Sequence, residues 1–145
     1  MVQHGDGALR TALSHYMAAT PPWDRDQYLD ALTRRFTIAR DWALFLEKHP
    51  VLLMPNSWER QFPVDDDLQS TDRVAQMLLA QAPMLSVAVL GLPGLSVPTG
   101  LWSGLPTGVQ LVGGRFREDI LLTAGEVIER AAGFSAMEIL ADRPI

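Results

Sequence analysis

The sequence of 145 residues contains no cysteine, and Lys48 is its single lysine. The missing cysteine excludes disulfide bonds, cysteine-ligated zinc and thiol catalysis within these residues. Acidic residues outnumber basic ones by 17 to 12, which gives a formal net charge of -5, and no block of Lys and Arg occurs. Because a nucleic-acid partner requires a basic surface, this charge balance argues against nucleic-acid binding.

Long apolar runs are also missing. A helix that crosses a bilayer needs about 20 consecutive apolar residues, and Pro, Gly and Ser interrupt the best candidate, residues 82–97. We therefore expect no membrane partner and interpret this stretch as buried core. Residues 1–7 lack the basic and apolar regions of a secretory signal, so a cytoplasmic location is expected.

Apolar residues are nevertheless abundant, at 48% of the chain, with four Trp and five Phe. Their burial offsets the entropy of ordering the chain and argues against disorder. We expect one domain over residues 1–145. Its expected parts are an N-terminal helix in residues 1–23, a main region in residues 24–133 and a tail in residues 134–145.

Apolar positions recur at helical spacing in several segments. The predicted helices cover residues 9–17, 24–49, 71–82, 84–90 and 117–132. Asp6 is the expected N-cap of the first, and Asp24 with Gln27 has capping-box spacing at the second. Pro50 follows the second helix, and Gly133 suits a left-handed stop of the last one.

Three other segments have strand patterns. Residues 51–54 form an uninterrupted apolar run, which predicts a strand buried on both faces. Residues 94–100 and 108–113 alternate, and a turn at Ser103-Gly104 between them predicts an antiparallel pair. The fold class is therefore α/β, with a small mixed sheet and packing helices.

No catalytic constellation is visible. Ser96 follows Gly94 as in a nucleophile elbow, but Pro98 replaces the second glycine, and the strand pattern favours a buried structural serine. The expected catalytic set is therefore empty.

The histidines share no triad or metal-ligand spacing. We expect His15 on the solvated side of the first helix. His49 and Lys48 are expected at the end of the second helix, where the helix dipole favours cations. His4 is the remaining histidine.

Metal and cofactor sites are not expected either. The run Asp65-Asp66-Asp67 has no glycine for a calcium-type turn and is interpreted as a solvated loop. The glycines between residues 91 and 114 match neither a dinucleotide fingerprint nor a phosphate loop, and turns explain them better.

Trp58 and Trp102 lie just after predicted strands, where open α/β sheets place their ligand crevice. Asn56 stands at the end of the first strand. These three residues are our candidates for a substrate cleft, although the tryptophans would also serve to shield the edge of a core.

Ordered Gly, Pro and apolar positions occur in two neighbouring segments. They are Gly-Leu-Pro-Gly-Leu-Ser-Val-Pro-Thr-Gly at residues 91–100 and Gly-Leu-Pro-Thr-Gly-Val-Gln-Leu-Val-Gly at residues 104–113, followed by Phe-Arg-Glu at residues 116–118. In this order they resemble the C-terminal portion of amidase-signature hydrolases. The resemblance spans about residues 25–132, so the main region is similar to an amidase C-terminal part. Ala88 departs from the family, which usually has Asn there.

The resemblance implies hydrolysis of an amide C–N bond. It also implies that the catalytic lysine and the Gly/Ser-rich stretch with two catalytic serines precede the resembling region, and these 145 residues contain no such stretch. We therefore expect a C-terminal fragment or subunit of an amidase that is inactive alone. The expected partner is the missing N-terminal catalytic portion or a second copy, with Leu13 of the first helix in the dimer contact.

Two alternatives remain open. One is a non-enzymatic, self-associating module derived from an amidase, and the other is an independent binder of small ligands.

Overall fold

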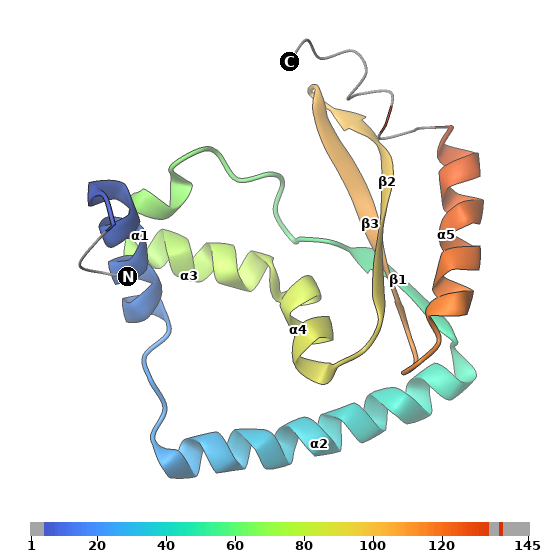
Figure 1. Cartoon of the computed structure of the whole chain (residues 1–145), viewed down its shortest axis with the longest axis horizontal. Helices are drawn as coiled ribbons and strands as arrows, with labels where there is room; N and C mark the ends of the chain where they lie inside the picture. The colour runs from blue at the N-terminus through green and yellow to red at the C-terminus, as the bar shows by residue number, and fades with distance from the viewer. Residues whose placement is uncertain (1–4, 134–136, 138–145) are drawn as a thin grey trace. The chain divides into compact units, whose positions relative to one another are not determined.

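The computed structural model describes residues 5–133 and Met137. Within these residues the elements follow one another along the chain, and Figure 1 labels the α-helices and β-strands. They are α1 (Gly7–Ala19), α2 (Arg25–Lys48), β1 (Val51–Pro55), the 3-10 helix η1 (Asp66–Leu68), α3 (Thr71–Ala80), α4 (Ala82–Leu90), β2 (Gly94–Trp102), β3 (Leu105–Gly113) and α5 (Glu118–Ala132). His4 and, apart from Met137, the expected tail lie outside the described residues.

The chain divides into two compact units. The helical unit comprises the described residues up to Arg34 and the segment Ser57–Ala82. The sheet unit comprises Arg35–Asn56 and the described residues from Pro83 onward. The continuous helix α2 begins in the first unit and ends in the second.

Side-chain caps fix the starts of the first two helices. Asp6 Oδ1 accepts a hydrogen bond from the Leu9 amide at 2.8 Å. At α2 the capping box is reciprocal, because the Gln27 amide donates to Asp24 Oδ1 at 2.8 Å and the Asp24 amide donates to Gln27 Oε1 at 3.0 Å. Each bond satisfies an amide that the helix itself leaves without a partner. The predicted N-termini of both helices are thereby confirmed.

An ion-pair cluster joins η1 to α3 in the helical unit. Asp66 is only 4% exposed and accepts from Arg73 Nη2 at 2.7 Å, while Glu59 accepts from the same guanidinium at 2.9 Å. The hydrogen bond to Asp66, reinforced by Glu59, raises the pKa of Arg73 above its ordinary value. The prediction of a solvated acidic loop is therefore wrong for Asp66, because a basic partner seven residues along the chain folds back onto it.

His15 also differs from expectation. Its Nδ1 lies 3.0 Å from Thr71 Oγ1, and the ring is half-buried rather than solvated. The reason is that α1 packs against α3 and η1 and turns this side of the helix inward.

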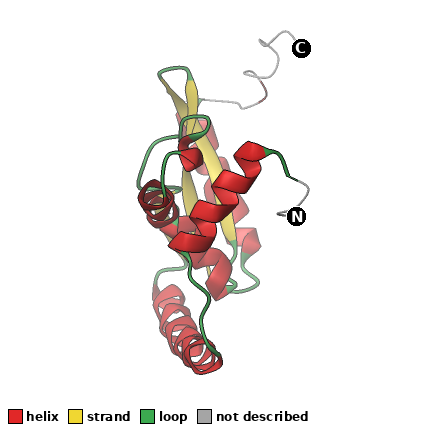
Figure 2. Cartoon of the chain, turned by 90° about the vertical axis from the view of Figure 1, so that its left-hand side faces the viewer, coloured by secondary structure: helices red, strands yellow, loops and turns green. Residues whose placement is uncertain are grey.

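The sheet unit contains a three-stranded sheet with the order β1-β3-β2. Both pairings are antiparallel, so the described strands include no parallel pair of the mixed sheet expected from the sequence. The turn at Ser103 and Gly104 has positive φ at both residues, 50° and 79°, as two-residue hairpins require. Figure 2 shows the twist of the long β2–β3 hairpin. The α/β class and the predicted hairpin are confirmed.

β1 is an edge strand rather than one buried on both faces. Its single neighbour among the described strands is β3, and Leu53 remains 58% exposed. The uninterrupted apolar run therefore predicts a strand correctly but overestimates its burial.

Helix α5 covers one face of the sheet (Figure 1). The core cluster there consists of Val97, Leu111 and Leu121. At Gly125 the helix comes so close to β2 that an added Cβ would lie 2.6 Å from Leu95 Cδ2. The absence of a side chain at Gly125 therefore allows α5 and β2 to pack closely.

Helix α4 begins earlier than predicted, because Pro83 lies in its first turn, where proline loses no helical hydrogen bond. It ends in a Schellman motif. Gly91 has φ of 66° and donates to the Ala88 carbonyl, and Leu92 donates to the Val87 carbonyl, both at 3.2 Å. Ala88 thus contributes through its main chain.

The described helices do not include a single one with both the length and the apolar content to cross a bilayer. Only α3 and α4 taken together, across the bend between them, reach that measure.

Candidate functional site

The sheet face opposite α5 carries the most unusual polar cluster. Successive side chains of a strand point to opposite faces, and the apolar side chains of Leu95, Val97 and Leu111 pack in the core beneath α5. Ser96 is paired with Gln110 in the register of β2 and β3, so both side chains lie on the other face. Asn56 joins them from the end of β1.

Close main-chain approach brings these residues together. The Asn56 Nδ2 group donates to Ser96 Oγ at 2.9 Å, which connects the two outer strands across β3. A Cβ at Gly108 would lie 2.7 Å from the Val97 carbonyl oxygen and 3.3 Å from Asn56 Nδ2. Glycine at position 108 therefore keeps the space that this polar bridge occupies.

Two acceptors in the cluster have no partner in the structure. They are Asn56 Oδ1 and Gln110 Oε1, both of which are buried atoms, and the Gln110 residue is 5% exposed. A buried acceptor without a hydrogen bond costs about 1–3 kcal/mol. Buried acceptors are usually paired with an N–H or O–H donor of the protein or of an ordered water, and no described residue supplies one to these two atoms.

Ser96 does not have the surroundings of a nucleophile. It lies within β2 and is exposed, which corrects the expectation of a buried serine. Its hydrogen-bond partner is the amide nitrogen of Asn56, which donates and cannot accept the serine proton. An activated serine needs an adjacent base, so this arrangement supports binding rather than covalent catalysis.

The predicted cleft residues belong to different elements of the structure. Trp102 ends β2 beside the hairpin turn, six residues from Ser96. At the rise of a strand this is about 20 Å. Trp58 belongs to the helical unit, where its amide donates to the Ala80 carbonyl at 2.8 Å, and both tryptophans are more than half exposed. The structure therefore brings Asn56 together with Ser96 and Gln110 rather than with Trp102.

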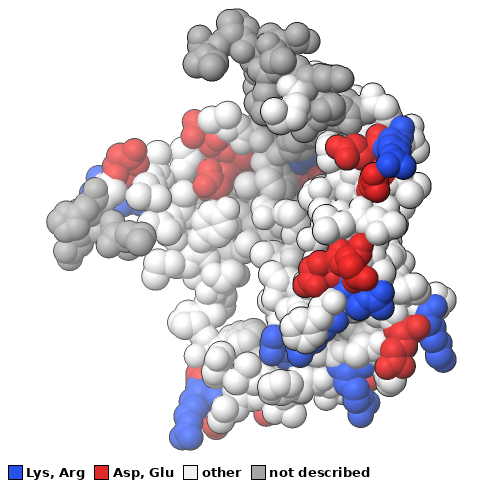
Figure 3. Space-filling view, turned by 45° about the vertical axis from the view of Figure 1, so that its right-hand side comes forward, with Lys and Arg blue, Asp and Glu red and all other residues white. Residues whose placement is uncertain are grey.

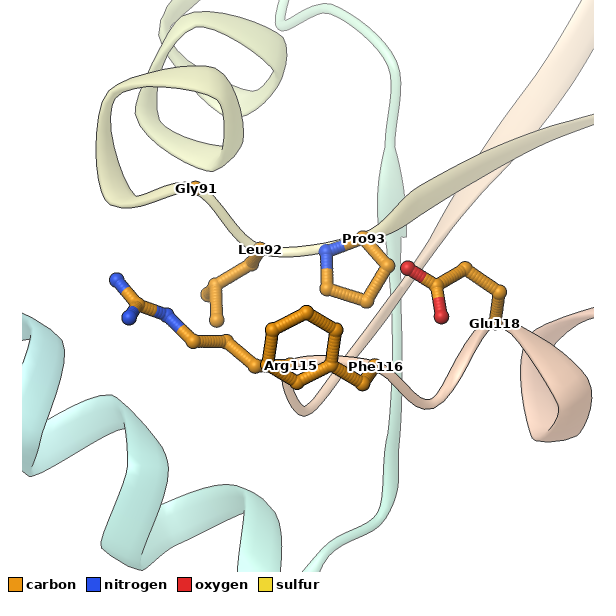
Figure 4. Close-up of a pocket in the computed structure, with 6 residues that line it drawn as sticks. All are labelled: Gly91, Leu92, Pro93, Arg115, Phe116 and Glu118. Carbon is orange, nitrogen blue, oxygen red and sulfur yellow. The ribbon is translucent and has the colours of Figure 1, made fainter.

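A second feature of the sheet unit is an open pocket of about 340 Å³ between two loops (Figure 4). Its lining residues are Gly91, Leu92, Pro93, Arg115, Phe116 and Glu118. Arg115 Nη2 donates to the Leu90 carbonyl at 3.4 Å, so the guanidinium also occupies the C-terminal end of α4. The pocket therefore contains a cationic side chain, Arg115, and an anionic one, Glu118, beside the apolar side chains that line the rest of it.

Gln110 and Arg115 were not among the residues selected from the sequence. A polar residue at the centre of the apolar strand 108–113 is a signal that would have identified Gln110. No comparable signal exists for Arg115, because its place in a pocket depends on the meeting of two loops.

Within residues 5–133 and Met137, no three His, Asp or Glu side chains form a group that could hold a metal ion. On the face shown in Figure 3, acidic and basic side chains are interspersed rather than gathered into a field of one sign.

Comparisons with known proteins match most of the chain. The family model described as Amidase matches residues 9–122, a range that begins before the region of resemblance and includes most of α1. The chain is 40% identical over 114 residues to an indoleacetamide hydrolase of Bradyrhizobium japonicum, covering 78% of this chain and 24% of that protein.

A second group of relatives has a different name. The chain is 37% identical over 128 residues to a glutamyl-tRNA(Gln) amidotransferase subunit of Parvibaculum lavamentivorans, covering 88% of this chain and 25% of that protein. The corresponding subunit of Rhodospirillum rubrum is 40% identical over 109 residues, with 74% and 21% covered. The chain spans about a quarter of the length of the curated relatives it matches.

Proposed function

The chain belongs to the amidase family, and on that premise we propose that it is the C-terminal part of an amide C–N bond hydrolase. In this proposal it works only with a catalytic portion that supplies the Ser–Ser–Lys machinery. The observation that carries the proposal is the strong match to about a quarter of each relative, by a chain that has no Gly/Ser-rich nucleophile stretch.

The polar face of the sheet supports this role. Asn56 Oδ1 and Gln110 Oε1 are buried acceptors without partners, so in this proposal the side chains around them move apart on assembly and donors of the catalytic portion then bind them. We assign this face to the contact with that portion. Asn56, Trp58 and Trp102 remain proposed cleft residues of the assembled enzyme.

The substrate class follows from the names of the relatives. Indoleacetamide is a primary amide, and the hydrolase of that name is 40% identical over the matched region. We propose carboxamides as substrates of the assembled enzyme and the cytoplasm as its location. Recovery of the native protein in a membrane or exported fraction would contradict the location.

Reconstitution tests the function. The purified chain should hydrolyse neither indoleacetamide nor simple aryl amides, because a covalent route requires an activated nucleophile. Mixed with an indoleacetamide hydrolase truncated before its matched region, the chain should restore hydrolysis, and a serine-directed acylating reagent should abolish it. Hydrolysis by the chain alone would overturn the proposal, and so would a failure of the intact mixture to restore any activity.

Gln110→Leu supplies the matched variant for this experiment. It removes one buried acceptor without requiring a donor, so the isolated chain should retain its stability while reconstitution weakens. Leu85→Gln, an exposed substitution in α4, should leave reconstitution unchanged.

The alternative function is a self-associating, non-enzymatic module. Large exposed apolar residues on one side of α2 favour it, in particular Ile38 and Phe45. Soluble proteins rarely leave such side chains grouped without a partner.

A further inference from the structure

Helix α2 has an apolar groove on one side. The groove has a volume of about 330 Å³ and is lined by Ile38, Asp41, Trp42 and Phe45. Ile38 is 45% exposed and Phe45 is 42% exposed, while the Trp42 ring packs edge-on against Phe45 with their centroids 5.7 Å apart. The aromatic wall is therefore fixed within the helix and open to a partner.

Two rows of residues run along this side of the helix. Residues seven apart lie nearly on the same side of an α-helix. One row is small or apolar, with Ala31, Ile38 and Phe45, and the neighbouring row is charged. The charged row alternates in sign along Arg34, Asp41 and Lys48.

From these rows we propose that α2 is the contact between two copies of this chain, packed antiparallel about a twofold axis. We align the two helices so that Arg34 of each copy lies opposite Asp41 of the other. In this register the same oppositely charged pair forms twice. The same register places Phe45 level with Asp30 of the second copy and one residue away from its small Ala31. A self-complementary contact of this kind closes the assembly at a dimer.

The position of the axis supports the register. The midpoint between Arg34 and Asp41 falls close to the middle of α2, which runs from Arg25 to Lys48. The two helices therefore overlap along nearly their whole length. An axis at the centre of the groove itself would instead bring Asp41 close to its own copy, and like charges at that place are unfavourable.

The other apolar helix at the N-terminal side is less suitable for this role. Helix α1 packs against α3 and η1 within the helical unit and buries Ala12 there. Asp41 in turn has only an exposed ion pair with its neighbour Arg40 at 3.2 Å, which is weak enough to be exchanged for a contact with another chain.

Sedimentation equilibrium of the whole chain tests the proposal, which deepens the self-association alternative and needs no catalytic portion. A species of twice the 16.0 kDa chain mass is expected at micromolar concentrations. Phe45→Glu should weaken the dimer about 30-fold or more, as for a buried aromatic anchor. Leu44→Glu is the matched control, since Leu44 is an exposed apolar neighbour on another side of α2 and should change dimerisation little.

A charge exchange identifies the register. Arg34→Glu alone and Asp41→Lys alone should each weaken the dimer, because each creates a like-charge contact, and the double variant should restore it. Circular dichroism confirms that each variant keeps its helices. A monomer at high micromolar concentration, a dimer insensitive to Phe45→Glu, or a double variant no tighter than the single ones would overturn the proposal. Because amide hydrolysis plays no part in these measurements, their failure leaves the reconstitution test unaffected.

Discussion

The Asn56 amide donates to the Ser96 hydroxyl at 2.9 Å, although the two residues are 40 positions apart in the sequence. The bond connects the end of β1 with β2 across the intervening strand β3. It gives the serine a donor as its neighbour, where a nucleophile would need a base.

Ser96→Ala should therefore have a small effect. The bond is neutral and exposed, so its loss should lower the free energy of unfolding by about 1 kcal/mol or less. In the reconstituted enzyme, hydrolysis should stay within a few-fold of the parent. Urea unfolding and amide hydrolysis measure the two effects, with Ser86→Ala in α4 as the control. A loss of activity by several orders of magnitude would identify Ser96 as the nucleophile instead.

Gly108 and Gly125 should respond differently to alanine. At Gly108 the new Cβ would meet the Val97 main-chain oxygen at 2.7 Å, which cannot move without distorting the hairpin. Gly108→Ala should cost about 1–3 kcal/mol of stability. At Gly125 the short contact is with the flexible end of Leu95, Val97 Cγ2 would lie 3.3 Å away, and alanine gains roughly 1 kcal/mol of helix propensity. Thermal unfolding should therefore show Gly125→Ala close to the parent. An equal loss from both substitutions would contradict this distinction.

Asp66 should be important for the helical unit. Asp66→Ala removes the buried partner of Arg73 and Gln69, and should destabilise the unit by about 1–3 kcal/mol. Asp67→Ala, which changes the adjacent acid outside this contact, should have a much smaller effect. Amide hydrogen exchange in α1 and α3 measures the difference. Equal exchange in the two variants would show that the ion pair contributes little.

Asp119 should titrate abnormally. The hydrogen bond from Arg117 lowers the pKa of the Asp119 carboxyl below its ordinary value, and the Arg117 pKa rises correspondingly. A carboxyl with a lowered folded-state pKa contributes stability above its unfolded pKa and loses it as the pH falls through the folded pKa. Carbon-detected NMR should show the Asp119 pKa rising in Arg117→Ala. If the Asp119 pKa were the same in Arg117→Ala as in the parent, Arg117 would not be the cause of the lowered pKa.

Trp102 provides a test of the cleft proposal. If it lines a ligand crevice, indoleacetamide should change the fluorescence of the chain saturably, and Trp102→Phe should remove most of the change. Trp23→Phe, in the segment before α2, is the control. A signal that persists in Trp102→Phe and disappears in Trp58→Phe would assign the cleft to Trp58, whereas no saturable signal in the parent would favour the role of shielding a core edge.

Local signals explain why most elements could be predicted. The helix caps, the Ser103-Gly104 turn and Gly133 act through bonds or dihedral angles within a few residues, so their patterns are complete in the sequence. Gly133, for example, has φ of 59° at the end of α5, as a left-handed stop requires. The family resemblance rests on ordered positions of this local kind.

Burial and long-range pairing could not be predicted in the same way. Leu53 is exposed because β1 lies at the edge of the sheet formed by the described strands, and an apolar run in the sequence does not indicate how many strands flank it. Asp66 is buried because Arg73 of α3 reaches back to it, and Glu59 binds the same guanidinium. The Asn56–Ser96 bridge likewise depends on strand order, so Asn56 was selected as a candidate without its partner.

The central place of β3 has a consequence for how the chain folds. Strands β2 and β3 and helix α5 are consecutive, so the hairpin and its covering helix can assemble from neighbouring residues, which favours rapid formation. Strand β1 joins β3 only after the long segment between Pro55 and Val109 has closed into a loop, and that closure carries an entropic cost. The β1–β3 hydrogen bonds should therefore form last and open first. Local unfolding should begin at β1, while the amides of the β2–β3 hairpin stay protected from hydrogen exchange.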